Sequence, residues 1–297
     1  MDKIKKILCP IDLSANSGMV IEYAINFGRR YNIEPELLYV STKPPEVYYR
    51  FFPDVMTYLA SLERNAESEV AKFRQKLETD LDIILRHGDV YQEILSYARE
   101  AAVDIIIMHA NSYSMIRENR LGMIAHKVIR KADCPVLTLY GEVSSKPVKN
   151  ILCPLDLSTR SYEGLAQAIA LAEVFNANLY VLHVLEIEKF KIEGERGVNK
   201  DDTYAILSKH LEDEIKVPIE FKGMKIEKVI TRSVDAADGI INFARENEMD
   251  LIALATHGHG YWPRVLLGSV TEKVIQIAPC PVITLRLQKG DKDDSKN

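Results

Sequence analysis

The apolar residues of this chain fall into short runs that alternate with longer amphipathic stretches. Near the C-terminus, Asp250 precedes the apolar run Leu251 to Leu254, which is typical of a buried parallel strand. From Val270 to Ala278 the apolar residues recur at helical spacing. The same patterns predict strands at 5–11, 36–40, 82–85, 104–108, 136–139, 150–155, 179–184, 227–231, 250–254 and 282–285, with helices between them.

Alternating strands and helices predict an α/β fold in which parallel strands form a doubly wound sheet. Such sheets bind ligands at the carboxyl ends of the strands that flank the point where the strand order reverses. If the first and fourth strands of the second half flank that point, Asp156 and the loop 255–269 share one crevice.

The chain contains this pattern twice. Lys5 to Ser14 reads KKILCPIDLS and Lys149 to Ser158 reads KNILCPLDLS, with eight identical residues of ten at an offset of 144. Near the other end of each half, ADCPVLTL at 132–139 corresponds to APCPVITL at 278–285, at an offset of 146. Internal similarity over such a length indicates two copies of one domain.

Two domains of ordinary size account for the 297 residues. We expect five-stranded domains at 1–142 and 147–288, and a charged, disordered tail at 289–297. The linker between the domains is short, so the two halves should pack against each other.

The loop after the strand predicted at 250–254 carries candidate chemistry. It contains Gly258 and Gly260 and closes on Gly268 and Ser269, where a helix begins. Glycines let the backbone approach a ligand closely, and the free N–H groups of a helix N-terminus favour an anion. Ser269 is placed to cap that helix or to bond a phosphate oxygen. Together these features predict a phosphate cradle, whereas the glycines alone would indicate only a turn.

Composition argues against several classes of partner. A formal charge of −5 and a pI near 5.9 give no electrostatic case for nucleic acid or an anionic membrane. No apolar run approaches the ~20 residues that span a bilayer, and the N-terminus lacks a signal-peptide pattern. The cysteines match no metal motif, and we expect reduced structural thiols in a cytoplasmic protein. They are Cys9, Cys134, Cys153 and Cys280.

These residues resemble the universal stress protein family in its tandem form. The resemblance covers nearly the whole chain and rests on Pro-x-Asp-x-Ser after the first strand, the glycine loop, and Cys-Pro-Val at the end of each half. The family signature is Gly, two residues, Gly, nine residues, then Gly followed by Ser or Thr. Gly258, Gly268 and Ser269 match it, whereas Ala255 replaces the first glycine.

The resemblance implies Rossmann-like domains of the adenine-nucleotide-hydrolase type, with an ATP site in the second half. Asp156 would meet the ribose or base, Val184 the adenine, and the loop and following helix the ribose and phosphates. It implies no catalytic residue and no protein metal site, and leaves open whether Mg²⁺ accompanies ATP. The implied site residues are Pro154, Leu155, Asp156, Val184, Leu254, Ala255, His257, Gly258, Gly268, Ser269, Val270 and Thr271.

The first half departs from the family pattern. Pro10, Asp12 and Val40 persist, but the loop after the fourth strand keeps only Gly122, and Met123 stands where the hydroxyl residue belongs. Side chains at 109 and 112 should crowd the close backbone approach that phosphates need. We therefore expect this half to bind nucleotide poorly or not at all.

Several residues admit two interpretations. Asp12 and Asp156 could cap the helix after the first strand instead of contacting a ligand. His183 fits a hydrogen-bonded core histidine, and the pair His257 and His259 has no third metal ligand in the sequence. The aromatic insertion at 43–53 fits either internal packing or a partner surface.

Three functions stay open. The first is an ATP-binding protein of a stress response, in which nucleotide alters shape or an unidentified protein partner. The second is a slow ATPase or hydrolase of adenine nucleotides, disfavoured because the loop lacks the Lys of a Walker-type motif. The third is a nucleotide-free interaction or ligand-binding protein.

The family resemblance also suggests how the halves associate. The apolar edge strands at 136–139 and 282–285 are of the kind that invites pairing. Their pairing would make the chain an intramolecular pseudo-dimer, and a homodimer of such chains is left open.

Overall fold

The computed structural model describes residues 4–42, 54–77, 81–110, 121–141, 146–186, 200–217, 224–255 and 267–286. The chain divides into two compact units, Asp2–Lys146 and Pro147–Asn297, which we describe separately as the N-terminal and C-terminal domains. The insertion at 43–53, most of the glycine loop and the tail therefore lie outside the described residues.

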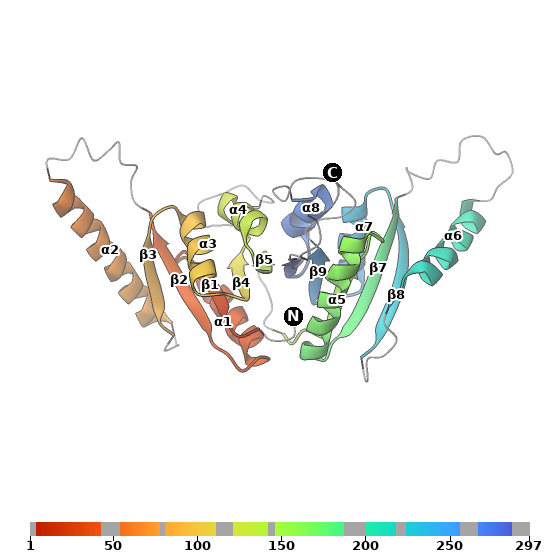
Figure 1. Ribbon diagram of the computed structural model, residues 1–297, viewed down its shortest axis with the longest axis horizontal. Coiled ribbons are helices and arrows are strands. Elements are labelled where there is room, and N and C mark those ends of the chain that lie inside the picture. Colours follow the sequence, from red (N-terminus) through yellow and green to blue (C-terminus); the bar gives the residue numbers. More distant parts are fainter. Residues whose placement is uncertain are drawn as a thin grey trace, which may run out of the picture. The chain divides into compact units, whose positions relative to one another are not determined.

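The N-terminal domain is a parallel sheet with the strand order β3-β2-β1-β4-β5 (Figure 1). Its strands are β1 (Ile7–Ile11), β2 (Pro35–Ser41), β3 (Ile83–His87), β4 (Ile105–His109) and β5 (Val136–Leu139). Its helices are α1 (Ala15–Arg29), α2 (Val55–Lys76), α3 (Val90–Glu100) and α4 (Met123–Lys131).

The C-terminal domain repeats this arrangement with the order β8-β7-β6-β9-β10. Its strands are β6 (Asn150–Pro154), β7 (Asn178–Glu186), β8 (Ile226–Ser233), β9 (Leu251–Ala255) and β10 (Val282–Leu285). Its helices are α5 (Thr159–Phe175), α6 (Lys200–Glu214), α7 (Ala236–Glu246) and α8 (Ser269–Ile277). The α/β fold with parallel, doubly wound sheets is thus confirmed.

In each domain the first strand lies between the second and the fourth. The chain leaves that strand in one direction and later returns past it in the other, so right-handed connections put the early and late helices on opposite faces. The expected switch point is therefore present in both domains. Asp156, just after β6, and Ala255, the last residue of β9, lie at the same edge of their sheet.

The central strands explain why the sequence shows short continuous apolar runs. Ile7, Leu8 and Cys9 of β1 are fully buried, as are the residues of β4 at 105–107. The corresponding residues of β6 and β9 are buried as well. Strands covered by helices on both faces need no polar alternation.

A partly exposed carboxylate at the amino end of the fourth strand fixes the register between the first and fourth strands of each domain. Asp104 Oδ2 accepts the N–H groups of Lys5 (2.7 Å) and Lys6 (3.0 Å). In the C-terminal domain, Asp250 Oδ2 accepts the N–H groups of Lys149 (2.8 Å) and Asn150 (2.9 Å). A carboxylate that accepts two backbone donors makes strong, charge-assisted hydrogen bonds, so the strands meet in one register.

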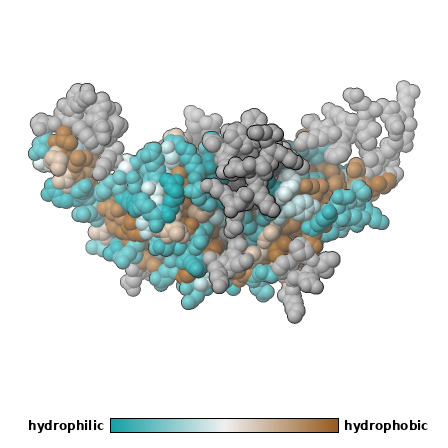
Figure 2. Space-filling model, viewed as in Figure 1, coloured by the Kyte–Doolittle hydropathy of each residue, from teal (hydrophilic) through white to brown (hydrophobic). Residues whose placement is uncertain are grey.

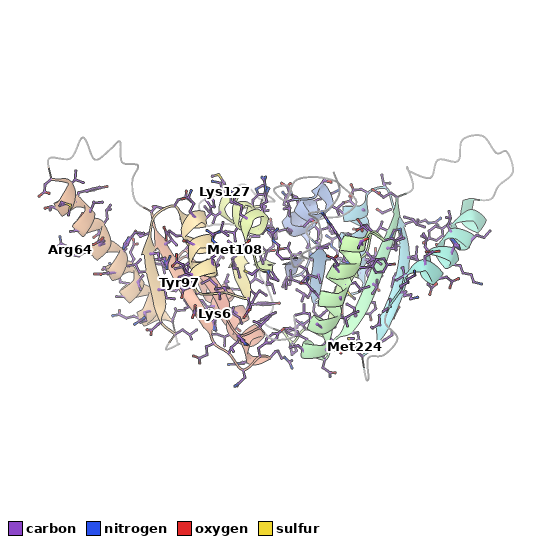
Figure 3. All side chains as sticks on the ribbon, viewed as in Figure 1. Lys6, Arg64, Tyr97, Met108, Lys127 and Met224 are labelled. Carbon is purple, nitrogen blue, oxygen red and sulfur yellow. The ribbon has the colours of Figure 1, made fainter. Side chains whose placement is uncertain are left out.

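Polar contacts anchor α3 over the N-terminal sheet. The Tyr97 hydroxyl donates to Glu36 Oε2 (2.8 Å), and Lys6 Nζ lies 3.2 Å from Glu36 Oε1; Lys6 and Tyr97 are labelled in Figure 3. Lys127 of α4 stands over the Tyr91 ring, 4.4 Å from its centroid. Hydrophilic residues form the outer surface over this helix (Figure 2). The helix is thereby held in place at the edge of the crevice.

All four cysteines are free thiols; three of them are buried, and Cys280 is partly exposed. Cys9 and Cys153 are buried in the central strands, and burial raises the pKa of the Cys153 thiol to about 12. Burial, followed by the charge of Asp250, raises the pKa of Cys280 to about 12. Among the described residues, no helix is both long and apolar enough to cross a membrane.

Native protein at pH 8 should therefore react very slowly with a thiol reagent at Cys153. A pKa near 12 leaves roughly a thousandfold less thiolate than an ordinary thiol has. The measurement is the rate of colour release from a dithiobenzoate reagent, with and without guanidinium, followed by mass spectrometry to locate the modified residues. Fast modification of Cys153 without denaturant would contradict the expectation.

Candidate functional site

The turn between β6 and α5 holds a carboxylate in a fixed position. Asp156 Oδ1 accepts the backbone N–H of Ser158 (3.0 Å) and the hydroxyl of the same residue (2.6 Å). Between them, Leu157 has a φ of 65°, in the left-handed region that branched side chains rarely adopt. The exposed Asp156 is therefore held at the carboxyl end of the sheet by a turn that carries backbone strain.

The N-terminal domain has the same turn. Leu13 has a φ of 58°, and Asp12 Oδ1 accepts the N–H of Ser14 (3.0 Å) and the hydroxyl of Ser17 (2.9 Å). A strained conformation costs of order 1–3 kcal/mol at each such residue, and it persists only where surrounding contacts impose it. Because the same turn follows the first strand in both domains, it is a repeated feature of the fold and not a property of one loop.

The capping interpretation of these aspartates is wrong. Ser158 is the N-cap residue of α5, and its Oγ accepts the N–H of Ser161 (3.2 Å). Ser14 occupies the same position at α1. Because the aspartates precede the N-cap by two residues, their carboxylates hold the turn before the helix and are not its N-cap.

His183 supports the same edge from the neighbouring strand. Its Nδ1 lies 2.8 Å from the carbonyl oxygen of Leu155, directly before Asp156. A carbonyl oxygen only accepts, so Nδ1 carries the proton. His183 is hydrogen-bonded as predicted, but it is partly exposed and does not lie in the core.

The helix that follows the glycine loop begins without a side-chain cap. Gly268 is the N-cap residue of α8, whereas Ser158 caps α5 and Asp235 caps α7. Among the described residues, a Cβ placed on Gly268 would meet only Thr271 Oγ1, at 3.8 Å. Its first N–H groups are donors that an anion can use.

The other residues of the implied ATP site are placed as follows. Val184 lies within β7, two residues before its end, and packs against α7: a Cβ on Gly239 would come 2.7 Å from Val184 Cγ1. Leu155 and Leu254 are buried, so their side chains belong to the core beneath the crevice. Pro154 and Val270 are partly exposed, Ser269 is exposed and Thr271 is buried. His257 and Gly258 lie outside the described residues, as does His259.

Ala255 packs against Gly164 of α5, a contact that the sequence does not predict. A Cβ placed on Gly164 of α5 would lie 3.0 Å from Ala255 Cβ. The methyl group of Ala255 therefore faces the helix, in space that the absence of a side chain at Gly164 provides. In the N-terminal domain the corresponding positions hold Val20 and His109.

Replacement of Gly164 by Ala should reveal this contact. In an open helical position, Gly to Ala stabilises by roughly 0.5–1 kcal/mol. We expect Gly164→Ala to raise the free energy of unfolding by less than that, or to lower it. In a protein that already carries Ala255→Gly, the same substitution should give the full stabilisation. Chemical denaturation of the single and double variants measures the coupling.

Gly18→Ala in α1 is the matched control, because a Cβ there meets nothing within 4 Å. It should give the ordinary gain. Equal gains at Gly18 and Gly164 would show that Ala255 and α5 are not in restrictive contact.

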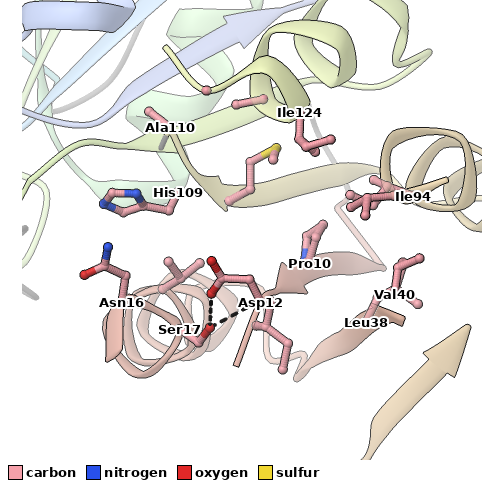
Figure 4. Close-up of a pocket in the computed structure, with 16 residues that line it drawn as sticks. Pro10, Asp12, Asn16, Ser17, Leu38, Val40, Ile94, His109, Ala110 and Ile124 are labelled. Atoms are coloured by element: carbon pink, nitrogen blue, oxygen red, sulfur yellow. Dashed lines mark hydrogen bonds between the residues drawn. The ribbon is translucent and has the colours of Figure 1, made fainter. Parts of the chain in front are cut away.

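The N-terminal domain contains a cavity of about 230 Å³ at the equivalent place (Figure 4). It is lined from the ends of β1, β2 and β4 and from α1, α3 and α4. Asp12 and His109 are among its lining residues. The side chain of His109, which the sequence predicts to crowd this site, therefore lies beside a cavity and does not fill it. Residue 112, the other expected obstruction, lies outside the described residues.

No group of three His, Cys, Asp or Glu side chains suited to a metal ion occurs among the described residues. Ligand contacts in the part of the chain that the structure describes would therefore come from single polar groups, helix N–H groups and apolar walls.

Comparison with known proteins now identifies the domains. The model of the universal stress protein family matches residues 3–139 and again residues 147–286. The chain belongs to the universal stress protein family. The two matches make it a tandem, two-domain member.

Individual relatives support the assignment. Universal stress protein MJ0531 of Methanocaldococcus jannaschii is 32% identical over 150 residues, which are 48% of this chain and 85% of that protein. A universal stress protein of Mycolicibacterium smegmatis is 22% identical over 293 residues, 94% of this chain and 96% of the relative. The crystal structure of a universal stress protein from Archaeoglobus fulgidus covers 95% of this chain and 98% of its own, with a TM-score of 0.65 and 21% identity, a likeness of fold.

Proposed function

We propose that this universal stress protein binds ATP in the crevice of its C-terminal domain and that the bound nucleotide regulates its part in a stress response. The observation that carries the proposal is the glycine N-cap of α8, which gives the helix no side-chain cap, in the domain whose β6 ends at the fixed carboxylate of Asp156. The helix N-terminus suits phosphate and the carboxylate suits hydroxyl donors, and ATP carries phosphates together with the hydroxyl groups of its ribose.

The phosphate end of the crevice is built from α8. Its macrodipole and unsatisfied N–H groups favour negative charge at Gly268 and Ser269. The exposed hydroxyl of Ser269 adds a donor for a phosphate oxygen. Mg²⁺ is commonly held through substrate phosphates, so a metal ion would enter this site with the nucleotide.

The nucleoside end is built from β6 and β7. Asp156 projects at the carboxyl end of the sheet, where its held carboxylate can accept hydrogen bonds from ribose hydroxyls. Val184 and the partly exposed Pro154 provide apolar surface for the base. This division of polar and apolar groups supports binding and orientation of a nucleotide.

The proposed role is binding rather than turnover. Phosphoryl transfer requires charge neutralisation and a positioned acceptor in addition to a phosphate cradle. In this proposal, Asp156 and Ser269 bind and orient the nucleotide, and neither attacks a phosphate. ATP incubated with the protein should therefore be recovered unchanged, and release of ADP would favour the hydrolase alternative.

The substitution Gly268→Asp tests the site. Aspartate is a good N-cap residue and glycine only slightly worse, so α8 should be as stable as before or gain roughly a few tenths of a kcal/mol. The new carboxylate occupies the place proposed for phosphate, and ATP should bind at least about tenfold more weakly. Calorimetric titration of Mg-ATP into nucleotide-stripped protein measures the affinity and the number of sites.

Gly122→Asp makes the same change at the start of α4 and is the control. One ATP site per chain that survives Gly122→Asp and is lost in Gly268→Asp supports the proposal. Unchanged binding in Gly268→Asp, or loss only in Gly122→Asp, would refute it.

A further inference from the structure

An ion pair joins α8 to α7 in the C-terminal domain. The ammonium nitrogen of Lys273 lies 3.2 Å from Asp235 Oδ1 and 2.9 Å from Asp238 Oδ2. Asp235 is also the N-cap residue of α7, and its Oδ1 accepts the N–H of Asp238 (3.1 Å). One lysine of α8 thus faces two carboxylates at the start of the neighbouring helix.

This ion pair lies beside the crevice. Asp235 follows the end of β8 after a single residue, and α7 packs against α8. In the N-terminal domain, Val90 begins the equivalent helix and lines the cavity together with Gly122. At an offset of 146 these two positions correspond to Ala236 and Gly268. The repeat therefore places the starts of α7 and α8 on the rim of one crevice.

The lysine and the aspartates carry their charges near neutral pH, as such side chains ordinarily do. The hydrogen bond to Asp238 is the main cause that raises the pKa of Lys273, and the hydrogen bond from the Asp238 backbone is the main cause that lowers the pKa of Asp235. One positive and two negative charges sum to −1, and without the lysine the sum would be −2.

An uncompensated pair of aspartates at this rim would act against phosphate binding. Asp156 already places a carboxylate at the same edge of the sheet, and ATP brings further negative charge. The three side chains of the ion pair are between 39% and 47% exposed, so their mutual contact adds little to stability. Their net charge nevertheless acts on an anion bound nearby, over a range that salt shortens.

The N-terminal domain uses the corresponding positions differently. Gln92, a neutral residue, takes the place of Asp238. Lys127 holds the position of Lys273, and its ammonium group stands over the Tyr91 ring, 4.4 Å from the centroid (Lys127 is labelled in Figure 3). The second carboxylate and the lysine that compensates it therefore occur together in the C-terminal domain.

We propose that Lys273 is a positioning residue of the C-terminal ATP site, which acts through Asp235 and Asp238 by compensating their charge and so lets the start of α8 accept phosphate. This inference rests on the proposed function. Lys273 does not touch the nucleotide in this scheme. Its effect grows with the negative charge of the ligand, so it favours a nucleotide over the nucleoside.

The probes are adenosine and Mg-ATP, titrated calorimetrically into the full chain at ionic strengths of about 0.02 M and about 0.5 M. Lys273→Met removes the positive charge, whereas Lys273→Arg keeps it. Lys273→Met combined with Asp238→Asn returns the local sum of charges to −1. Lys127→Met is the matched control, because it makes the same change in net charge at the equivalent position of the other domain.

At the lower ionic strength, Lys273→Met should weaken Mg-ATP binding at least about threefold and leave the affinity for adenosine within about twofold. Higher salt should reduce the difference. Lys273→Arg, the double variant and Lys127→Met should each bind Mg-ATP within about twofold of the unaltered protein. A purely structural role of Lys273 would not be rescued by removal of a carboxylate.

The proposal is overturned if Lys273→Met leaves Mg-ATP binding unchanged, if it weakens adenosine and Mg-ATP equally, or if Asp238→Asn does not restore binding. An equal loss in Lys127→Met would also overturn it, because the effect would then belong to the charge of the whole chain. Failure of the proposed function is a separate result. The unaltered protein would then not bind Mg-ATP, or Gly268→Asp would bind it equally well, and the inference would fall with the site.

Discussion

The register between the first and fourth strands is the constraint on which each crevice depends. Asp104 and Asp250 impose it at the amino ends of the strands, where one carboxylate oxygen accepts two backbone N–H groups. The chemistry lies at the opposite, carboxyl ends. A shift of one residue there would separate Asp12 or Asp156 from the residues that end β4 or β9, and would turn alternate side chains away from the crevice.

Within that common frame, the two domains differ through a few side chains. Ala255 and Gly164 of the C-terminal domain correspond to His109 and Val20 of the N-terminal domain, so both the strand end and the adjacent helix differ between the domains. The strained leucine turn and its aspartate are retained in both. The turn that fixes the carboxylate is thus shared, whereas the residues at the end of the fourth strand and on the adjacent helix differ.

Much of the fold could be predicted because strands that are buried on both faces appear in the sequence as short continuous apolar runs. The apolar run at 251–254 and the matching motifs at 5–14 and 149–158 predicted the strands, the repeat and the switch point. The contact between Gly164 and Ala255 could not be predicted, because it joins positions far apart in the chain and a helical glycine has no pattern of its own. The N-terminal cavity could not be predicted for a related reason: the missing glycines predict a crowded loop, whereas the space is lined by Val40, Ile94 and Met108, which belong to other elements.

Covalent linkage of the two domains changes what mutation can do to them. In an assembly of two identical chains, every substitution enters both copies, so a residue that improves one crevice also alters the other. In this chain Met123 and Ser269 are encoded separately although they occupy the same place in the fold. A substitution can therefore alter one domain and leave the residues of the other unchanged. Every molecule nevertheless contains the two domains in a ratio of one to one.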